Sequence, residues 1–432
     1  MGFHPAWGEI RKWIDRSESI FIKKLARNDC SWADDSRKHQ SGFFIPANIV
    51  KTGFFPPLKN TNPKKPHIFD VEYMTLWPAS GEVKKSTIKH YSNKGNEVHH
   101  TGVPKDQFSG LTPASLLLAG KLVDPEDHIS HWFMVIDSGS DEAEIIENAF
   151  GLEAGFHFSV FSPDAITNEL SDAESLFEEV AQAIKNGTLD KFVAAQALPP
   201  SIKLAALAQD DWLRKERLTD LDPWRIASPG DAVMQISRDV EYTLYKALEM
   251  RLRAAQVAQI LSKKGSDPLR EAVLEFARLD AVFLSASQTR KSRAGLSFEH
   301  HMERLLRDGR IRHEAQAVLG GRRPDFVLPS VAALNAKGDA VLLSLKTTLR
   351  ERWKQLALEK QRGVIFLATV DDRVSGEAIG EMLEHDIALL VPESLKNAKE
   401  TEYSDYANVI TFRHFFDHEV RGKRPSLVLP LT

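Results

Sequence analysis

Three polar residues in the last third of the sequence have the types and positions needed to hydrolyse a phosphodiester with a divalent cation. Asp325 begins one apolar run, Lys346 ends the next, and Glu359 lies in the helical pattern that follows. Carboxylates bind hard cations such as Mg²⁺, and a lysine beside an attacking water can orient that water or help to deprotonate it. These residues predict a Mg²⁺ site with Asp325 and Glu359 as metal ligands and Lys346 beside them.

The run that ends at Lys346 is apolar almost throughout, which predicts a buried strand over 340–346. Ser344 shares a face with Lys346 because side chains alternate along a strand. A buried lysine needs a partner, and Asp325 or Glu359 would supply one. The alternative is that Lys346 merely ends a strand and that Glu359 lies on a solvated helix face.

An amphipathic helix is predicted over 296–308 from its apolar residues at helical spacing. Glu299 lies on it one turn before Glu303, and either carboxylate could join the metal site or belong to a charged solvent face. The sequence within and next to this helix is rich in basic residues, which could bind phosphate. Such a run is also typical of a solvated surface. The basic residues are Arg290, Lys291, Arg293, Arg304, Arg307, Arg310, Arg312, Arg322 and Arg323.

From residue 237 onward helical and strand patterns alternate, which predicts an α/β core with a mixed sheet. The helices are expected at 238–262, 267–286, 296–308, 350–361 and 375–385, and the strands at 325–328, 340–346, 364–369 and 387–391. Residues 1–160 are instead typical of a β-rich region, with strands expected near 43–45, 68–71 and 131–136. The polar stretches 27–42 and 92–107 are expected to be binding loops, 173–181 a helix and 199–231 a connecting or inserted segment.

Length and composition indicate an ordinary globular protein with two domains. The chain has 432 residues, 42% hydrophobic and 27% charged, and a net charge of −4 that excludes a uniformly basic nucleic-acid binder but allows a local basic cleft. The single cysteine, Cys30, excludes an internal disulfide and a cysteine zinc site. We expect a soluble cytoplasmic protein, because no signal peptide and no apolar run of about 20 residues is evident. The pairs His99–His100 and His300–His301 lack zinc-finger spacing and are not expected to bind metal.

Three ordered segments together resemble the EcoRII restriction endonuclease family, and the likeness covers most of 236–395. They are 291–299 (KSRAGLSFE), 323–326 (RPDF) and 346–353 (KTTLRERW). The N-terminal half resembles that family's effector domain more weakly, through 21–25 (FIKKL) and 39–46 (HQSGFFIP).

The resemblance implies two domains joined by a linker at 163–175. Residues 1–162 would form an effector domain, an all-β DNA-binding pseudobarrel with short helices. Residues 176–432 would form a catalytic α/β domain with the restriction-endonuclease-like PD-(D/E)xK fold and a central mixed sheet.

The resemblance also implies an activity, that of a Mg²⁺-dependent type IIE enzyme cutting both strands of DNA at a short, near-palindromic site. Asp325, Lys346 and Glu359 carry over as catalytic residues, with Glu299 as an accessory acid. In this family the second carboxylate lies on the helix after the lysine strand, which accounts for Ser344.

DNA-reading residues carry over from the family as well. In the catalytic domain the outer G·C pairs would be read by side chains that suit guanine and cytosine edges, namely Arg350, Glu351 and Arg352. Arg238 would contact the flipped central bases, and Arg293 would contact DNA. In the effector domain the corresponding set is Lys38, His39, Phe44, Lys94, Asn96, Glu97 and His99. Phe44 stands where a tyrosine is expected and the second loop has lost most of its basic residues, so altered sequence preference or affinity is expected there.

The partners implied are double-stranded DNA in more than one site copy, a second chain bound through the catalytic domain, and a separate cognate methyltransferase. Docking of the effector domain would restrain cleavage. Two alternatives stay open, a modification-dependent endonuclease that senses methylcytosine and a non-catalytic DNA-binding regulator. Methylated substrate and Mg²⁺-dependent cleavage distinguish them.

Overall fold

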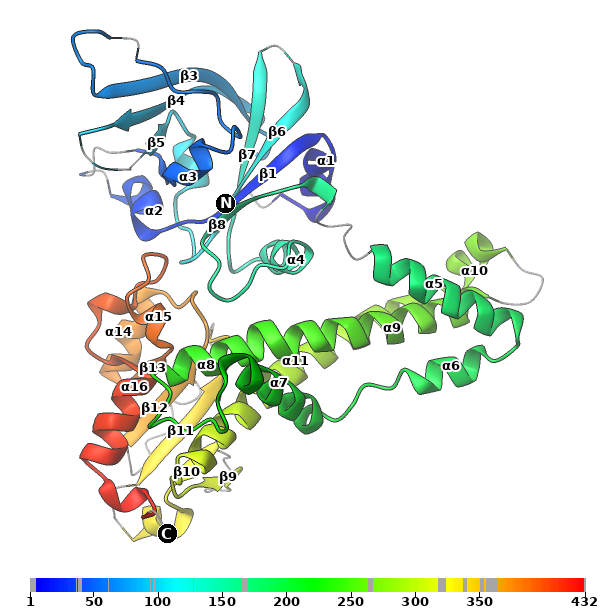
Figure 1. Cartoon of the computed structure of the whole chain (residues 1–432), viewed down its shortest axis with the longest axis vertical. Coiled ribbons are helices and arrows are strands. Elements are labelled where there is room, and N and C mark those ends of the chain that lie inside the picture. Colours follow the sequence, from blue (N-terminus) through cyan, green and yellow to red (C-terminus); the bar gives the residue numbers. More distant parts are fainter. Residues whose placement is uncertain are drawn as a thin grey trace. The chain divides into compact units, whose positions relative to one another are not determined.

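The computed structural model divides the chain into two units, shown with their elements in Figure 1. The first unit is Met1–Asn168 with Asp372–Gly376 and Asn397–Asp405, and the second is Glu169–Asp371 with Glu377–Lys396 and Tyr406–Thr432. The residues described are 5–35, 37, 41–60, 62–93, 95, 98–126, 128–164, 170–262, 267–317, 324–336, 340–349, 353–354 and 364–430.

The first unit is built on one eight-stranded sheet with the order β2-β5-β4-β3-β7-β6-β1-β8. The strands are β1 (Ser17–Lys24), β2 (Phe43–Ile45), β3 (Ile68–Trp77), β4 (Glu82–Tyr91), β5 (Val98–Thr101), β6 (Leu116–Glu126), β7 (Ile129–Ile136) and β8 (Phe158–Phe161). All neighbours pair antiparallel except β3 and β7, which are parallel. The β-rich character and the three strands expected here are confirmed.

Both faces of this sheet carry a hydrophobic core. Phe21 of β1 packs into one cluster, whereas its neighbours Ile20 and Ile22 pack into the other, as the two-residue period of a strand requires. The helices of this unit are α1 (Trp7–Asp15), α2 (Arg27–Asp34), α3 (Ala47–Val50), α4 (Asp141–Ala149) and the 3-10 turn η1 (Lys105–Gln107).

The two polar stretches expected to be loops are partly regular structure, so that expectation was wrong for them. Residues 27–34 form α2, because the buried Asp29 accepts hydrogen bonds from the N–H groups of Ala26 and Phe44, each at 2.8 Å. Trp32 is buried on the same helix. Within 92–107, β5 and η1 are formed, and Val98 and His100 are buried.

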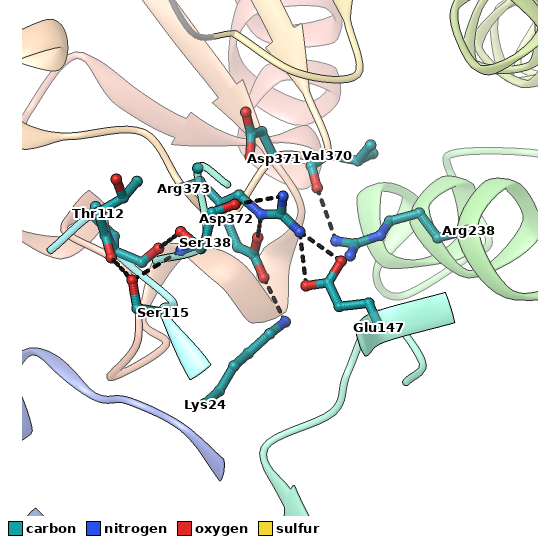
Figure 2. Close-up of polar contacts among 12 residues, drawn as sticks. Lys24, Thr112, Ser115, Ser138, Glu147, Arg238, Val370, Asp371, Asp372 and Arg373 are labelled. Atoms are coloured by element: carbon teal, nitrogen blue, oxygen red, sulfur yellow. Dashed lines mark hydrogen bonds and ion pairs between the residues drawn. The ribbon is translucent and has the colours of Figure 1, made fainter. Parts of the chain in front are cut away.

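Two segments from late in the chain belong to the first unit, and polar contacts hold one of them, Asp372–Gly376, there (Figure 2). The Asp372 carboxylate lies 2.6 Å from Lys24 Nζ, and both side chains are almost fully buried. Arg373 donates to both carboxylate oxygens of Glu147, at 2.7 and 2.6 Å, and to the Ser138 carbonyl at 2.9 Å. The folded first unit therefore includes residues that lie far from it in sequence.

The second unit contains a six-stranded mixed sheet with the order β14-β13-β12-β11-β10-β9. The strands are β9 (Glu314–Ala315), β10 (Phe326–Leu328), β11 (Val341–Lys346), β12 (Val364–Thr369), β13 (Ile387–Val391) and β14 (Val409–Thr411). Strands β11 to β14 run parallel, whereas β9 and β10 are antiparallel. The mixed sheet and its four expected strands are confirmed, and β9 and β14 were not expected.

Helices of the second unit lie beside this sheet and extend from it (Figure 1). They are α5 (Leu170–Lys185), α6 (Leu189–Ala195), α7 (Ser201–Glu216), α8 (Pro229–Gln235), the π-helical turn η3 (Ile236–Glu241), α9 (Tyr242–Leu261), α10 (Pro268–Leu274), α11 (Phe276–Asp308), α12 (Val331–Asn335), α14 (Gly376–Glu384), α15 (Glu393–Lys396), α16 (Phe412–His414) and the π-helical turn η5 (Phe415–Gly422). The helix expected at 350–361 lies almost entirely outside the described residues. Among those described, no helix is long and apolar enough to cross a membrane.

Two stretches of this unit differ in secondary structure from what their sequence patterns suggested. The stretch 199–231 is largely helical, because Leu204, Ala208 and Trp212 recur at one helical face and are buried. The separate helices expected at 267–286 and 296–308 are instead α10 and the single long α11, with the break at Glu275.

Candidate active site

Asp325 lies immediately before β10, next to the strand that carries Lys346. Its Oδ2 accepts a hydrogen bond of 2.6 Å from the Leu345 N–H, which orients the carboxylate toward the end of β11. The residue is only 9% exposed. Burial raises the pKa of Asp325 above its usual range, while the nearby Lys346 ammonium acts in the opposite direction.

Lys346 is the last residue of β11, whose preceding residues are all buried. Its Nζ lies 3.8 Å from Asp325 Oδ2 and donates a 2.9 Å hydrogen bond to the Leu345 carbonyl. The side chain is 30% exposed, so the ammonium faces both the buried carboxylate and solvent. The structure thus brings two of the predicted catalytic residues together.

Glu299 of α11 belongs to the same group of charges. Burial raises its pKa first, Asp325 raises it further, and Lys346 lowers it, so the three side chains interact electrostatically. Its Oε2 also accepts a 2.6 Å hydrogen bond from Gln316 Nε2. The fourth predicted residue, Glu359, lies outside the described residues.

The charge balance of this group suits a divalent cation. Asp325 and Glu299 are partly desolvated carboxylates, burial raises the pKa of each, and Asp325 raises the pKa of Glu299 further, so a bound cation would favour their charged forms. Mg²⁺ commonly binds through one or two carboxylates and keeps several waters. No group of three or more His, Cys, Asp or Glu side chains that could hold a metal occurs in the described part of the chain.

Arg238 lies on η3 and reaches the turn that follows β12. Its Nη1 donates a long hydrogen bond of 3.5 Å to the Val370 carbonyl (Figure 2). The turn η3 is anchored nearby by Glu241, which lies 2.9 Å from Nε2 of the fully buried His301. Ser297 Oγ donates to the same carboxylate at 2.7 Å, so His301 serves as a core partner of η3.

Arg293 lies on α11 where α9 and α11 run side by side (Figure 1). Its guanidinium lies over the Tyr245 ring, 5.2 Å from the centroid, and donates to the Pro199 carbonyl. Its neighbour Arg290 lies 3.0 Å from Glu249. Both cations therefore have protein partners here, and a contact of Arg293 with DNA stays a prediction.

In the first unit, two predicted DNA-binding residues are direct neighbours. Phe44 of β2 pairs with His99 of β5, their rings lie 4.8 Å apart, and His99 Nε2 lies 2.9 Å from the Ser41 carbonyl. His100 is instead a core residue, 2.9 Å from the Tyr73 hydroxyl, and burial lowers its pKa to about 3. Five other predicted residues, Lys38, His39, Lys94, Asn96 and Glu97, lie outside the described residues, as do Arg350, Glu351 and Arg352 of the second unit.

Asp371, a buried carboxylate beyond β12, was not predicted as a functional residue. The signal was present, because two consecutive aspartates follow directly after an apolar strand and Val370. Its contacts are described below.

Comparisons with known proteins now bear on this site. Residues 251–416 match the family described as EcoRII C terminal. The chain is 27% identical over 398 residues to the type II restriction enzyme EcoRII of Escherichia coli, covering 87% of this chain and 88% of that enzyme. Over most of its length, the chain is therefore similar to a type II restriction enzyme of the EcoRII kind. The resemblance found in the sequence is therefore confirmed, and the chain is a DNA-hydrolysing enzyme.

Two further relatives of this EcoRII-like enzyme cover less of it. The type II restriction enzyme SsoII of Shigella sonnei is 33% identical over 160 residues, which span 34% of this chain and 52% of that enzyme. A solved structure of metal-depleted Ecl18kI in complex with uncleaved, modified DNA is 23% identical, with a TM-score of 0.48 over 57% of this chain and 87% of that one. Type II restriction endonucleases generally need a divalent metal, in keeping with the carboxylates at this site.

Proposed function

We propose that this enzyme is a Mg²⁺-dependent type IIE endonuclease that hydrolyses both strands of double-stranded DNA at a short, near-palindromic site flanked by G·C pairs. The observation that carries the proposal is the 3.8 Å approach of the Lys346 ammonium to the buried Asp325 carboxylate at the end of β11. Together with the EcoRII relationship, it favours an active nuclease over a DNA-binding protein that has lost catalysis.

Each side chain of the site has a distinct role in this proposal. Asp325 and Glu359 would hold Mg²⁺, with Glu299 as the accessory acid, and the metal would stabilise charge on the phosphate. Lys346 is partly exposed, so its ammonium can orient the attacking water and stabilise the negative charge that develops as the water gives up its proton to solvent. The Leu345 N–H keeps the Asp325 carboxylate turned toward this position.

Base reading is assigned to side chains on two elements. Arg350 and Arg352 would each bond O6 and N7 of a guanine, and Glu351 would accept from the N4 amino group of a cytosine. In the sequence these residues lie between Leu349 and Trp353, which are 1% and 2% exposed. Arg238 would meet the central bases, and Arg293 would contact DNA near them.

A near-palindromic target calls for a two-fold symmetric reader, and we assign dimerisation to the second unit. Four large apolar side chains at helical spacing on α10 and α11 are mostly exposed, namely Leu269, Val273, Phe276 and Phe283 at 72%, 72%, 68% and 58%. Nearby residues of both charge signs, including Arg270 and Asp280, suit contact with a second copy of the same surface.

The first unit is proposed to be the effector domain, a DNA-binding pseudobarrel that binds another copy of the site and restrains cleavage. The Phe44–His99 pair would lie at its DNA-binding edge. Because Phe44 lacks a tyrosine hydroxyl and the second loop carries few basic residues, this domain should differ from the EcoRII pattern in sequence preference or affinity. A separate methyltransferase would protect host sites.

The test is digestion of unmethylated phage DNA with Mg²⁺, followed by sequencing of the fragment ends, with Lys346→Met as the inactive control. Staggered ends at one short G·C-flanked sequence would support the proposal. Cleavage of methylated DNA alone would favour a modification-dependent endonuclease, and the absence of cleavage on both substrates would contradict the proposed function.

A further inference from the structure

The turn that follows β12 contains a buried carboxylate with a specific backbone partner. Asp371 is 6% exposed, and its Oδ2 accepts a 2.9 Å hydrogen bond from the Leu349 N–H. Its own N–H donates to Thr369 Oγ1 at 3.0 Å, which shapes the turn from the strand end. A buried carboxylate is costly unless such bonds compensate it, so this contact is a specific feature of the turn.

This hydrogen bond joins two neighbouring strand ends of the catalytic sheet. Strands β11 and β12 are parallel, and Lys346 pairs in register with Thr369. The chain after Lys346 and the chain after Thr369 therefore leave the sheet at the same edge. Asp371 links them at Leu349, the residue directly before the proposed base readers.

The same turn also contacts the other proposed reading element. The Val370 carbonyl accepts from Arg238 Nη1 at 3.5 Å, one residue before Asp371 (Figure 2). Val370 thus contacts the residue assigned to the central bases, and Asp371 contacts Leu349, the residue before those assigned to the outer pairs. Both contacts lie beside the strand that carries Lys346.

We propose that Asp371 is a positioning residue for sequence discrimination. Its carboxylate fixes the Leu349 backbone, directly before the proposed readers, beside the strand that carries Lys346, so that reading of the outer base pairs is coupled to placement of the scissile phosphate at the lysine. This inference rests on the proposed function and adds to it a residue that acts through the Leu349 backbone. Without the acceptor, Leu349 would lose the bond that ties it to the turn after β12.

Three full-length variants separate this role from a general loss of stability. Asp371→Ala removes the acceptor, whereas Asp371→Asn keeps a side-chain carbonyl at the same place. Asp308→Ala is the matched control, because Asp308 also accepts a backbone hydrogen bond within this unit, from the Leu221 N–H at 2.9 Å. Each protein is tested on the cognate sequence and on duplexes with one outer pair replaced, by single-turnover cleavage and by competition binding, with thermal unfolding alongside.

We expect Asp371→Ala to lose discrimination between cognate and altered duplexes by about 10–10²-fold, since one well-placed bidentate side chain discriminates against the wrong base by about this factor. Asp371→Asn should recover most of it, and Asp308→Ala should discriminate normally even if it unfolds at a lower temperature. Unchanged discrimination in a folded Asp371→Ala would overturn the inference. If that variant does not fold, Asp371→Glu, which displaces the acceptor by one methylene, decides in the same way.

Failure of the inference is distinguishable from failure of the proposed function. If wild-type and Asp371→Ala discriminate equally well between cognate and altered duplexes, only the positioning role of Asp371 is overturned. A wild-type protein that neither cuts DNA nor prefers any sequence overturns both. If wild-type binds selectively without cutting, competition binding alone decides the role of Asp371.

Discussion

Replacing Lys346 is the most direct perturbation of the proposed chemistry. At 3.8 Å from Asp325, the ammonium interacts with the carboxylate by about 4 kcal/mol at an effective dielectric constant near 20, before the opposing cost of desolvation. A positioned acid or base typically contributes about 10²–10⁴-fold to a rate. We therefore expect Lys346→Ala and Lys346→Met to reduce single-turnover cleavage by at least about 10²-fold while binding of the site changes only a few-fold.

The loss of stability caused by the same substitution should depend on pH. The pKa of Asp325 is already raised by burial, and loss of the ammonium removes a group that lowers it. When the pKa of a carboxyl is higher in the folded than in the unfolded protein, the group contributes to the free energy of unfolding below its unfolded-state pKa. That contribution is lost as pH rises through its folded-state pKa. Lys346→Met should therefore unfold at a lower temperature than wild-type at neutral pH, and this difference should shrink on acidification below the usual aspartate range.

The assay compares wild-type, Lys346→Met and the exposed-surface control Lys191→Ala in single-turnover cleavage with Mg²⁺ and in competition binding without metal. The control should match wild-type in both measurements. Cleavage by Lys346→Met within about tenfold of wild-type would remove Lys346 from the chemistry. Equal losses of cleavage and binding would assign it a structural role.

Three further outcomes are expected. On acidification, the cleavage rate should begin to fall at a pH above the usual carboxyl range, because burial raises the pKa of Asp325 and of Glu299. Protonation of these carboxylates opposes metal binding, and a pH–rate profile at fixed Mg²⁺ measures the effect. Lys24→Met should destabilise the first unit by about 3–5 kcal/mol by leaving Asp372 buried without its cation, and adding Asp372→Leu should restore most of that loss in denaturant unfolding. Val273→Glu should yield a monomer by sedimentation that no longer cuts both strands together, and a persisting dimer would place the interface elsewhere.

The pairing of Asp325 with Lys346 was predictable because its signals are local. An apolar run of about six residues predicts a strand, and a charged residue at its end predicts where the chain leaves the core. Two such runs adjacent in sequence usually pair in the sheet, which brings their polar ends together. The Leu345 N–H bond to Asp325 was not predictable, because it depends on the register of β10 against β11.

The helix α7 was missed because breakers mask its pattern. Pro199 and Pro200 precede it and further turn residues follow, so the stretch 199–231 as a whole is typical of a connection. The buried residues Leu204, Ala208 and Trp212 form one face only over 201–216. A window restricted to that range would have shown the helical period.

Recognition depends on contacts that no local pattern encodes. The proposed readers follow Leu349 directly in sequence, and the Leu349 N–H donates to a carboxylate from the turn after the next strand. Strand register brings Asp371 to that position, and Thr369 Oγ1 shapes the turn. An endonuclease with the same Asp–Lys pair but a different β12 turn would retain the chemistry and lose this constraint on the readers. Cleavage and discrimination are therefore expected to respond to different substitutions, cleavage to Lys346 and discrimination to Asp371.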